Sequence, residues 1–451
     1  AELNSTLSSV LSNQFLATYS RIQDTRTSPS SPFPFVDIYK DGDQYMNFGY
    51  ELFSWENDVI NNNYSFINNV SYLAGKHNLT GGASFEIQNF GNSFQRYGTS
   101  YYRYASVDDF INNARPIQFG LTYPYEGQDP YSRINFGMAG LYVQDKFAAT
   151  DRLNLTMGVR AELPVYMNDL TANPSIDNMT LLDPDGNETK YSSGEWPKSR
   201  VLLSPRIGFN YDLLEDRSLS LRGGTGIFSG RVPFVWLTNM PTGAGVIQNV
   251  VDGVSASTLD VIRFQPDHYY WLENGPSNVF IKQPNAGAPG SFALVDRNFK
   301  MPQVWRSSLG ADYTIAGTPL VATADLLFTK DLVGVYQFNA NRKPATMQLN
   351  NNGDNRDFWN GSSNARYNPA MSEAVVLTNN DKGHSLSATA GLTLPSRSGF
   401  FGSVFYTFTE AKDVTGNPGS SAGSAWSNNY SINDPNELLM GISQYSIPHR
   451  V

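Results

Sequence analysis

The stretch that decides the fold is GLYVQDKFAATDRLNLTMGVRAELPVY, at residues 140–166. Its second half alternates strictly, with small or polar residues between the apolar Leu153, Leu155, Met157 and Val159. A period of two residues places successive side chains on opposite faces of a β-strand. The stretch therefore predicts a hairpin whose strands have one apolar and one polar face.

The same alternation recurs along the chain in segments of about ten residues. Ile207 and Phe209 alternate with Gly208 and Asn210, for example, and comparable runs occur near residues 303–315 and 384–396. We predict eleven strands, at 7–22, 62–74, 77–91, 132–149, 152–166, 202–214, 218–229, 303–315, 319–330, 384–396 and 399–410.

The connections between these strands are alternately very short and very long. The tight turns are Gly75-Lys76-His77, Thr150-Asp151-Arg152, Glu215-Asp216-Arg217, Ala316-Gly317-Thr318 and Ser396-Arg397-Ser398. Long irregular stretches lie near 24–58, 92–130, 167–201, 231–302, 331–383 and 411–446. Long loops are rare in compact soluble domains, whereas short periplasmic turns and long extracellular loops are typical of outer-membrane barrels. The pattern favours an all-β, antiparallel transmembrane β-barrel over a soluble β-sandwich, which alternation alone would also allow.

Composition agrees with a barrel wall. Charged residues make up 16% of the 451-residue chain and aromatic residues 13%, with 25 Tyr and 27 Phe, whereas soluble domains carry roughly a quarter charged residues. No run of apolar residues is long enough for a transmembrane helix. The net charge of −9 argues against binding to nucleic acid.

Eleven strands do not make a closed bacterial barrel, because such barrels have even strand numbers and leave no edge unpaired in lipid. The start, from Leu7 to Arg21, is read as a strand already under way, and Ile447 to Val451 as the entry to another. We therefore expect the chain to be part of a larger barrel.

Four phrases carry a resemblance to a known family. They are SSPFPFVDIYKDG at 30–42, the hairpin at 140–166, LLSPRIGFNYDLLEDRSLSLRGGTGIFSGRVPFVWLTN at 202–239 and SIPHRV at 446–451. These phrases resemble the Oar-like branch of TonB-dependent outer-membrane receptors, which is related to the SusC-type transporters and is common in Bacteroidota and proteobacteria. The two hairpins are the most specific part of the match.

The resemblance implies a 22-stranded barrel in a Gram-negative outer membrane, filled by an N-terminal plug. It implies that TonB, with ExbB and ExbD, drives transport through a TonB box before the plug, and that a surface lipoprotein is a plausible partner. We expect residues 1–451 to be a partial barrel domain that lacks the plug, the TonB box and the C-terminal end of the barrel.

Aromatic clusters in the long loops are the candidate substrate-binding residues, because exposed rings often mark recognition sites. They are Tyr101, Tyr102, Arg103 and Tyr104 in one loop, and Trp236, Tyr269, Tyr270 and Trp271 in another. The alternative is that these rings form the interfacial girdle of the barrel or pack the loops together. Charged residues on the polar faces of strands, which would face the lumen and could pair with plug residues, are Arg160, Arg222, Arg306, Asp312 and Asp325.

The sequence gives no sign of an enzyme, a cofactor or a metal centre. It has no Cys and no G-x-S-x-G motif, and its four His are far apart. The segment Asp183–Glu188 could bind calcium but is better explained as a Pro-Asp-Gly turn. We predict import of a nutrient (an oligosaccharide, a peptide or a chelate). A passive porin or a surface-binding barrel without a motor is the alternative.

Overall fold

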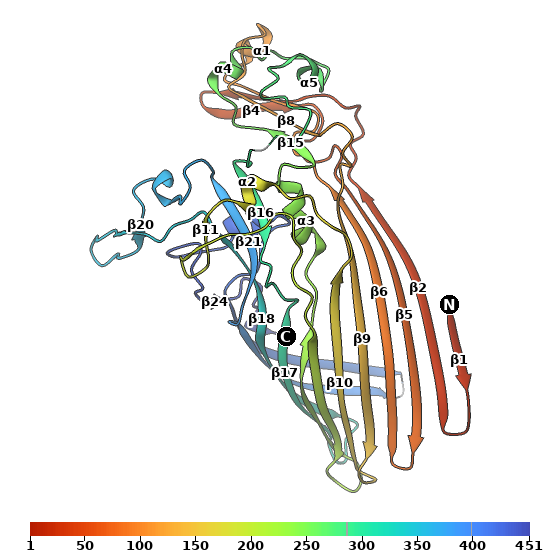
Figure 1. The fold of residues 1–451 in the computed structure, drawn as a ribbon. Coiled ribbons are helices and arrows are strands. Elements are labelled where there is room, and N and C mark those ends of the chain that lie inside the picture. Colours follow the sequence, from red (N-terminus) through yellow and green to blue (C-terminus); the bar gives the residue numbers. More distant parts are fainter. Residues whose placement is uncertain (286, 398) are drawn as a thin grey trace.

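The computed structural model describes residues 1–285, 287–397 and 399–451. Over these residues the largest sheet holds 16 strands, and Figure 1 shows its long strands standing side by side as one curved wall. Twelve of them form the wall, in the spatial order β1 (Glu2–Thr6), β2 (Leu11–Thr25), β5 (Asp58–Ala74), β6 (His77–Ser93), β9 (Ser132–Ala148), β10 (Leu153–Tyr166), β13 (Leu202–Asp212), β14 (Leu219–Ser229), β17 (Gln303–Thr314), β18 (Val321–Asn339), β22 (His384–Arg397) and β23 (Phe400–Asp413), and the other four come from the connections after β14. Neighbouring wall strands are antiparallel, and each pairs with the strand next to it in this order.

The predicted strands are confirmed, with one correction at the start of the chain. The segment 7–22 is not one continuous strand, because Leu7–Val10 form a turn between β1 and β2. The hydroxyl of Ser8 accepts hydrogen bonds from the backbone N–H groups of Val10 and Leu11, at 3.3 and 3.1 Å. Serine stabilises turns in this way, so it ends the strand that alternation alone would continue. Of the predicted turn at Ser396-Arg397-Ser398, the last residue lies outside the described part of the chain.

The register divides the wall into two faces. Residues directly opposite each other on antiparallel strands share a face, and Val143 lies opposite Gly81 and Val159, whereas Tyr142 lies opposite Gly82 and Arg160. Apolar side chains on the first face stay open to the surroundings, with Leu141 66% and Leu309 54% exposed. An apolar face that runs across a whole sheet without cover is the surface that lipid acyl chains contact.

The long loops are folded rather than irregular, which corrects the expectation from the sequence. Three of them supply a five-stranded sheet, the loop sheet, which lies above the wall in Figure 1. Its order is β15 (Gln248–Val251), β8 (Gln118–Pro124), β7 (Tyr101–Tyr104), β3 (Phe35–Lys40) and β4 (Asp43–Phe48). The short helices α1 (Val107–Ile111), α4 (Ala256–Leu259) and α5 (Tyr270–Asn274) lie beside it. Residues of this sheet and of 262–280 bury a hydrophobic cluster of their own, the distal cluster.

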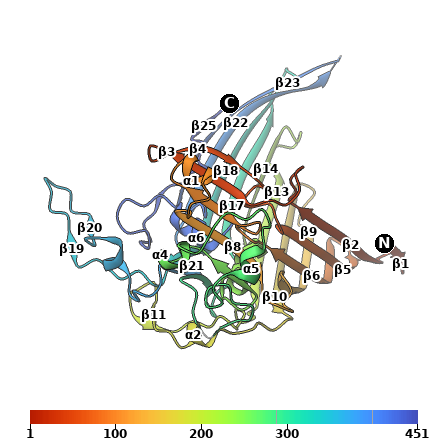
Figure 2. The same cartoon turned by 90° about the horizontal axis from the view of Figure 1, so that it is seen from above.

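A second hydrophobic cluster, the mouth cluster, lies at the top of the wall strands. It joins the upper end of β9 to α3 (Phe234–Gly243), β16 (Ser291–Val295) and β21 (Glu373–Asn380). Here β18 continues beyond the predicted end at 330 to Asn339 and pairs with β21. Figure 2, seen from above, shows β1 and β23 at the two ends of the wall and the strands β3, β4 and β8 of the loop sheet between them.

The remaining elements are short. They are α2 (Pro174–Asp177), β11 (Leu181–Leu182), β12 (Glu188–Thr189), β19 (Met347–Gln348), β20 (Asp357–Phe358), η1 (Ser362–Ala365), α6 (Ala422–Ser427), β24 (Gly441–Ile442) and β25 (His449–Arg450). The last of these pairs with β23, as the prediction of a strand entry after Ile447 requires. Across the part of the chain that is described, no helix is long and apolar enough to cross a membrane.

Candidate functional site on the polar face of the wall

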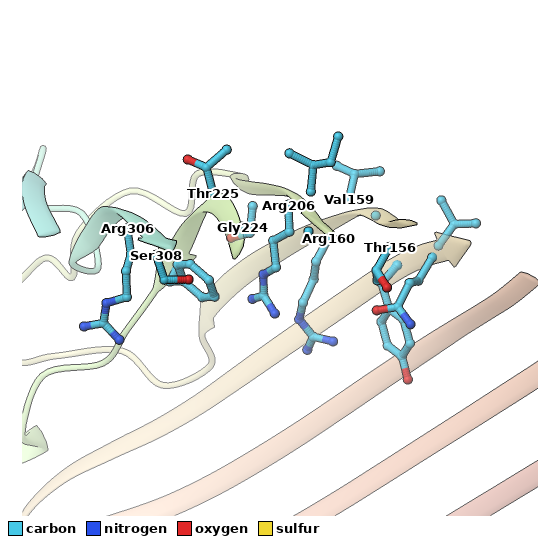
Figure 3. Close-up of a pocket in the computed structure, with 16 residues that line it drawn as sticks. Thr156, Val159, Arg160, Arg206, Gly224, Thr225, Arg306 and Ser308 are labelled. Carbon is cyan, nitrogen blue, oxygen red and sulfur yellow. The ribbon is translucent and has the colours of Figure 1, made fainter. Parts of the chain in front are cut away.

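Arginines gather on the polar face of the middle strands. Arg160 on β10, Arg206 on β13 and Arg306 on β17 point to the same side of the wall in Figure 3, away from Val159 and Thr225. Alternation along each strand explains this placement, since each arginine is an odd number of residues from an apolar neighbour that faces lipid. The predicted lumen-facing arginines therefore do share one face.

A strip of glycines lies beside these arginines. Gly158, Gly208 and Gly224 lie on adjacent strands and form the floor of a cavity of about 480 Å³ that the three arginines also line. A Cβ atom added at Gly224 would lie 2.9 Å from the carbonyl oxygen of Ile207. The backbone of the neighbouring strand β13 therefore leaves no room for a side chain at Gly224.

Three of the predicted charged residues meet one another within the wall. Arg222 on β14 forms ion pairs with Asp312 and with Asp325, the latter at 2.6 Å. The hydroxyl of Thr323 also donates to Asp312, at 2.8 Å. One guanidinium thus holds two carboxylates from neighbouring strands, and the cluster keeps a net charge of about −1.

Arg160 is paired in the same way. Its Nε lies 2.9 Å from Glu162, and it donates to the hydroxyl of Ser84 at 2.8 Å. At the upper end of the wall, Arg231 binds Glu86 with both terminal nitrogens, at 2.6 and 2.5 Å. Bidentate pairs of this kind fix the geometry of both side chains.

Two arginines differ from the others. Within the described residues, Arg206 and Arg306 have no carboxylate within 4.0 Å: Arg206 lies over the ring of Phe228 at 4.5 Å, and Arg306 donates to the hydroxyl of Thr329 at 3.2 Å. A guanidinium keeps its proton in proteins, so the glycine floor is flanked by two positive charges that no ion pair offsets. Arg206 was not among the predicted residues, although its spacing from Gly208 and Asn210 assigns it to the polar face.

The flanks of the polar face carry almost no charge. On β5 and β6 the row of Asn69, Ser71 and Thr80 is polar and neutral, and Ser71 and Thr80 share a hydrogen bond of 3.2 Å. On β22 and β23, Thr389 and Thr407 are paired in the same way at 2.8 Å. The arginines of the polar face thus concentrate on the middle strands, beside flanks lined mainly by hydroxyl and amide groups.

The aromatic residues predicted in the first loop are inside the loop sheet. Tyr102 and Tyr104 are 0% exposed and Tyr101 is 2% exposed, because both faces of β7 are covered. Arg103 binds Asp37 at 2.9 Å, and Tyr101 donates to the same carboxylate at 3.1 Å. These residues do not form the exposed patch that we expected, and they pack the loops together, which was the alternative.

The second aromatic group is divided. Trp271 is buried in the distal cluster, whereas Tyr269 and Tyr270 are half-buried at its border. Trp236, on α3, lines a cavity of about 340 Å³ beside Arg231, where the wall meets the loops.

Burial in the loop sheet also affects the ionisation of Tyr104. It raises the pKa of Tyr104 to about 12, so this phenol is neutral at physiological pH.

The segment Asp183–Glu188 forms a turn. Asp183 accepts hydrogen bonds from the backbone N–H groups of Asp185 and Asn187, at 2.9 and 2.8 Å, and Gly186 has a φ of 83°. This is the geometry of the Pro-Asp-Gly turn. In residues 1–285, 287–397 and 399–451, no group of three or more His, Asp or Glu is placed to hold a metal ion.

A wall with one exposed apolar face, one polar face, short turns at one end and long loops at the other defines an outer-membrane β-barrel. The chain belongs to the family described as "Outer membrane beta barrel domain", whose model matches residues 1–451. The protein is therefore a component of the Gram-negative outer membrane.

Several solved structures resemble the chain. The outer membrane transporter YddB from Escherichia coli is 11% identical, with a TM-score of 0.49, over 91% of this chain and 41% of its own. The copper transporter OprC is 12% identical, with a TM-score of 0.44, over 91% of this chain and 45% of its own. The FrpB iron transporter from Neisseria meningitidis is 10% identical, with a TM-score of 0.40, over 91% of this chain and 52% of its own.

The chain thus spans about half the length of these structures or less. A comparison with curated proteins found no match.

Proposed function

We propose that the chain is the wall and recognition surface of a TonB-dependent importer in the outer membrane. In this proposal the full-length protein is a 22-stranded barrel of the Oar-like, SusC-related branch, with a plug in its lumen and a TonB box that TonB, ExbB and ExbD engage. The protein performs no chemistry and imports a nutrient such as an oligosaccharide, a peptide or a chelate. Its contribution is selective binding and a gated path.

The folded loops carry this proposal. A passive porin needs an open mouth, whereas here the loops build a five-stranded sheet and two hydrophobic clusters above the wall. Packed loops of this kind suit a receptor that first binds its nutrient and then admits it. Tyr269, Tyr270 and Trp236 remain the proposed aromatic contacts to the nutrient, because they are not enclosed in either cluster.

The unpaired charges of Arg206 and Arg306 support the part of the proposal that concerns the plug. A charge in the lumen that no neighbour offsets is available to a carboxylate on whatever fills the barrel. We propose that acidic residues of the plug bind these two arginines over the glycine floor, while Arg160 and Arg222 keep their partners in the wall.

The test is import in cells that carry the full-length gene as their only copy. We expect growth on the imported nutrient, found by screening peptides, oligosaccharides and ferric chelates, to require TonB. The double variant Arg206→Glu/Arg306→Glu should lower uptake at least about tenfold, the equivalent of about 1.4 kcal/mol. Arg206→Lys/Arg306→Lys, which keeps both charges, should retain most of the uptake.

The outcome that contradicts the proposal is uptake that continues at the same rate without TonB. That result would establish the passive barrel as the function. A surface lipoprotein partner is a further part of the proposal, and co-purification of the tagged full-length protein with a lipoprotein from detergent-solubilised membranes tests it.

A further inference from the structure

A cavity of about 580 Å³ lies along the free edge of the loop sheet. One side of it is lined by β15 and the turn that follows, and the other by the end of α3, the segment before β16, and Ser372. Both Asn249 and Val250 line it, and their side chains belong to opposite faces of β15. The cavity therefore borders the edge of the strand rather than one of its faces.

The edge of β15 offers backbone hydrogen-bonding groups to this cavity. Within the described residues β15 pairs only with β8, and the backbone N–H of Tyr125 donates to the carbonyl of Ile247 at 3.0 Å. In an antiparallel pair the residues alternate in direction. The backbone groups of Ile247 and Asn249 thus face β8, and those of Gln248 and Val250 face the cavity.

The lining is small and nearly neutral. Gly243, Gly245, Ser291 and Ser372 lie across from β15 and leave the space beside its edge open. Among the described lining residues Asp252 alone is charged, and it already accepts a hydrogen bond from the N–H of Gly253 at 2.8 Å. The cavity has no cation to attract an anionic chelate or a phosphate.

We propose that this cavity binds a short, extended, uncharged peptide segment, which joins the loop sheet as a further strand beside β15. Unpaired N–H and C=O groups at a sheet edge repeat every two residues, and an extended peptide repeats its own groups at the same spacing. A saccharide has no such repeat. The inference rests on the proposed import function and names peptides as its substrate class.

The decisive variant is Val250→Pro. Proline removes one N–H that points into the cavity, and it is tolerated at an edge strand because the pairing with β8 does not use that group. Val250→Thr is the matched control, since it changes the side chain and keeps the N–H. Ser372→Trp is a second variant, which fills part of the cavity and leaves the sequence of β15 unchanged.

The experiment uses the full-length protein in detergent and a pool of capped, uncharged hexapeptides. Peptides retained after gel filtration are measured by mass spectrometry, beside a pool of neutral oligosaccharides. The wild type and Val250→Thr should retain peptides. Val250→Pro should retain roughly tenfold less, the loss expected for about one hydrogen bond. Ser372→Trp should also retain less, because its ring occupies space that the peptide needs.

Equal retention by the wild type and Val250→Pro would overturn the inference, as would retention of oligosaccharides alone or of nothing. If import in cells still requires TonB after such a result, the cavity assignment fails and the proposed function stands. If the wild type retains peptides and import does not require TonB, the cavity assignment stands and the motor coupling fails.

Discussion

Glycine has a defined role on the polar face, where neighbouring backbones leave no room for a side chain. At Gly224 the obstructing atoms are the Ile207 carbonyl oxygen at 2.9 Å and the Cα of Gly208 at 3.3 Å, and neither can rotate away. We expect Gly224→Val to destabilise the wall by about 1–3 kcal/mol, the usual cost of overpacking. The thermal midpoint at which the protein loses its folded mobility on a gel measures this.

Gly402 is the matched control for that variant. It also lies within a wall strand, β23, but a Cβ atom there would have no described atom within 4 Å. Gly402→Val should leave the midpoint unchanged or raise it. Equal losses at Gly224 and Gly402 would mean that crowding by β13 is not the cause.

For single residues, the sequence predicts the face on which a side chain lies but not the partner that it binds. The polar-face position of Arg160, Arg222 and Arg306 follows from alternation, which is local. Their partners do not, because Arg222 and Asp325 are 103 residues apart and meet only through strand order and register. Nor does alternation reveal that Arg306 has no ion pair with any residue that the structure describes.

Among the elements, the wall hairpins are predictable and the loop strands are not. A wall strand has one face in lipid and one in a polar lumen, so the contrast between faces is visible in the sequence. In β8, residues Phe119 to Tyr123 are all buried, so the alternation disappears. The pairing of β3 with β7 is parallel and joins different loops. No hairpin turn connects these two strands, so the sequence carries no local signal that predicts their pairing.

We expect His268 to make the loop elements sensitive to pH. It contacts Trp55 edge-on at a ring distance of 5.5 Å, its carbonyl accepts a hydrogen bond from Ser100, and its buried Nε2 has no partner among the described residues. Burial lowers the pKa of His268 from its ordinary value of 6.5, although Asp267 opposes this shift. The unfolded loop therefore takes up a proton at a higher pH than the folded loop does.

It follows that His268 contributes its full stability above about pH 6.5 and loses part of it as the pH falls below that value. We expect the loops to resist protease better at about pH 7.5 than at about pH 5.5, by less than about 1.4 kcal/mol per pH unit. His268→Phe keeps the ring contact and should flatten this dependence. An unchanged pH profile in that variant would assign the effect to other groups.

At the scale of the whole molecule, one face of the wall meets lipid and the other faces the lumen. Leu309 and Ser308 are neighbours in the middle of β17, and Leu309 is 54% exposed on the apolar face while Ser308 lines the arginine cavity. A lysine or arginine facing lipid near the bilayer midplane costs about 2–4 kcal/mol, whereas one facing a polar lumen does not. Leu309→Lys should therefore sharply reduce folded protein in the outer membrane, and Ser308→Lys should not.

Heat-modifiable protein in isolated outer membranes measures both variants. Equal yields would mean that the apolar face of the wall is not in contact with acyl chains. The reverse result, with Ser308→Lys failing to assemble, would mean that the faces are assigned the wrong way round.

The loop sheet takes its strands from three separate connections, β3 and β4 from 24–58, β7 and β8 from 92–130, and β15 from 231–302. Bacteriophages and antibodies select for altered surfaces, and loops are where insertions are usually tolerated. Here an insertion in one connection shifts strands that the other two depend on. We expect variation among natural relatives to be concentrated in tips such as Asp41-Gly42, and changes in the strands to arise in matched sets across all three connections.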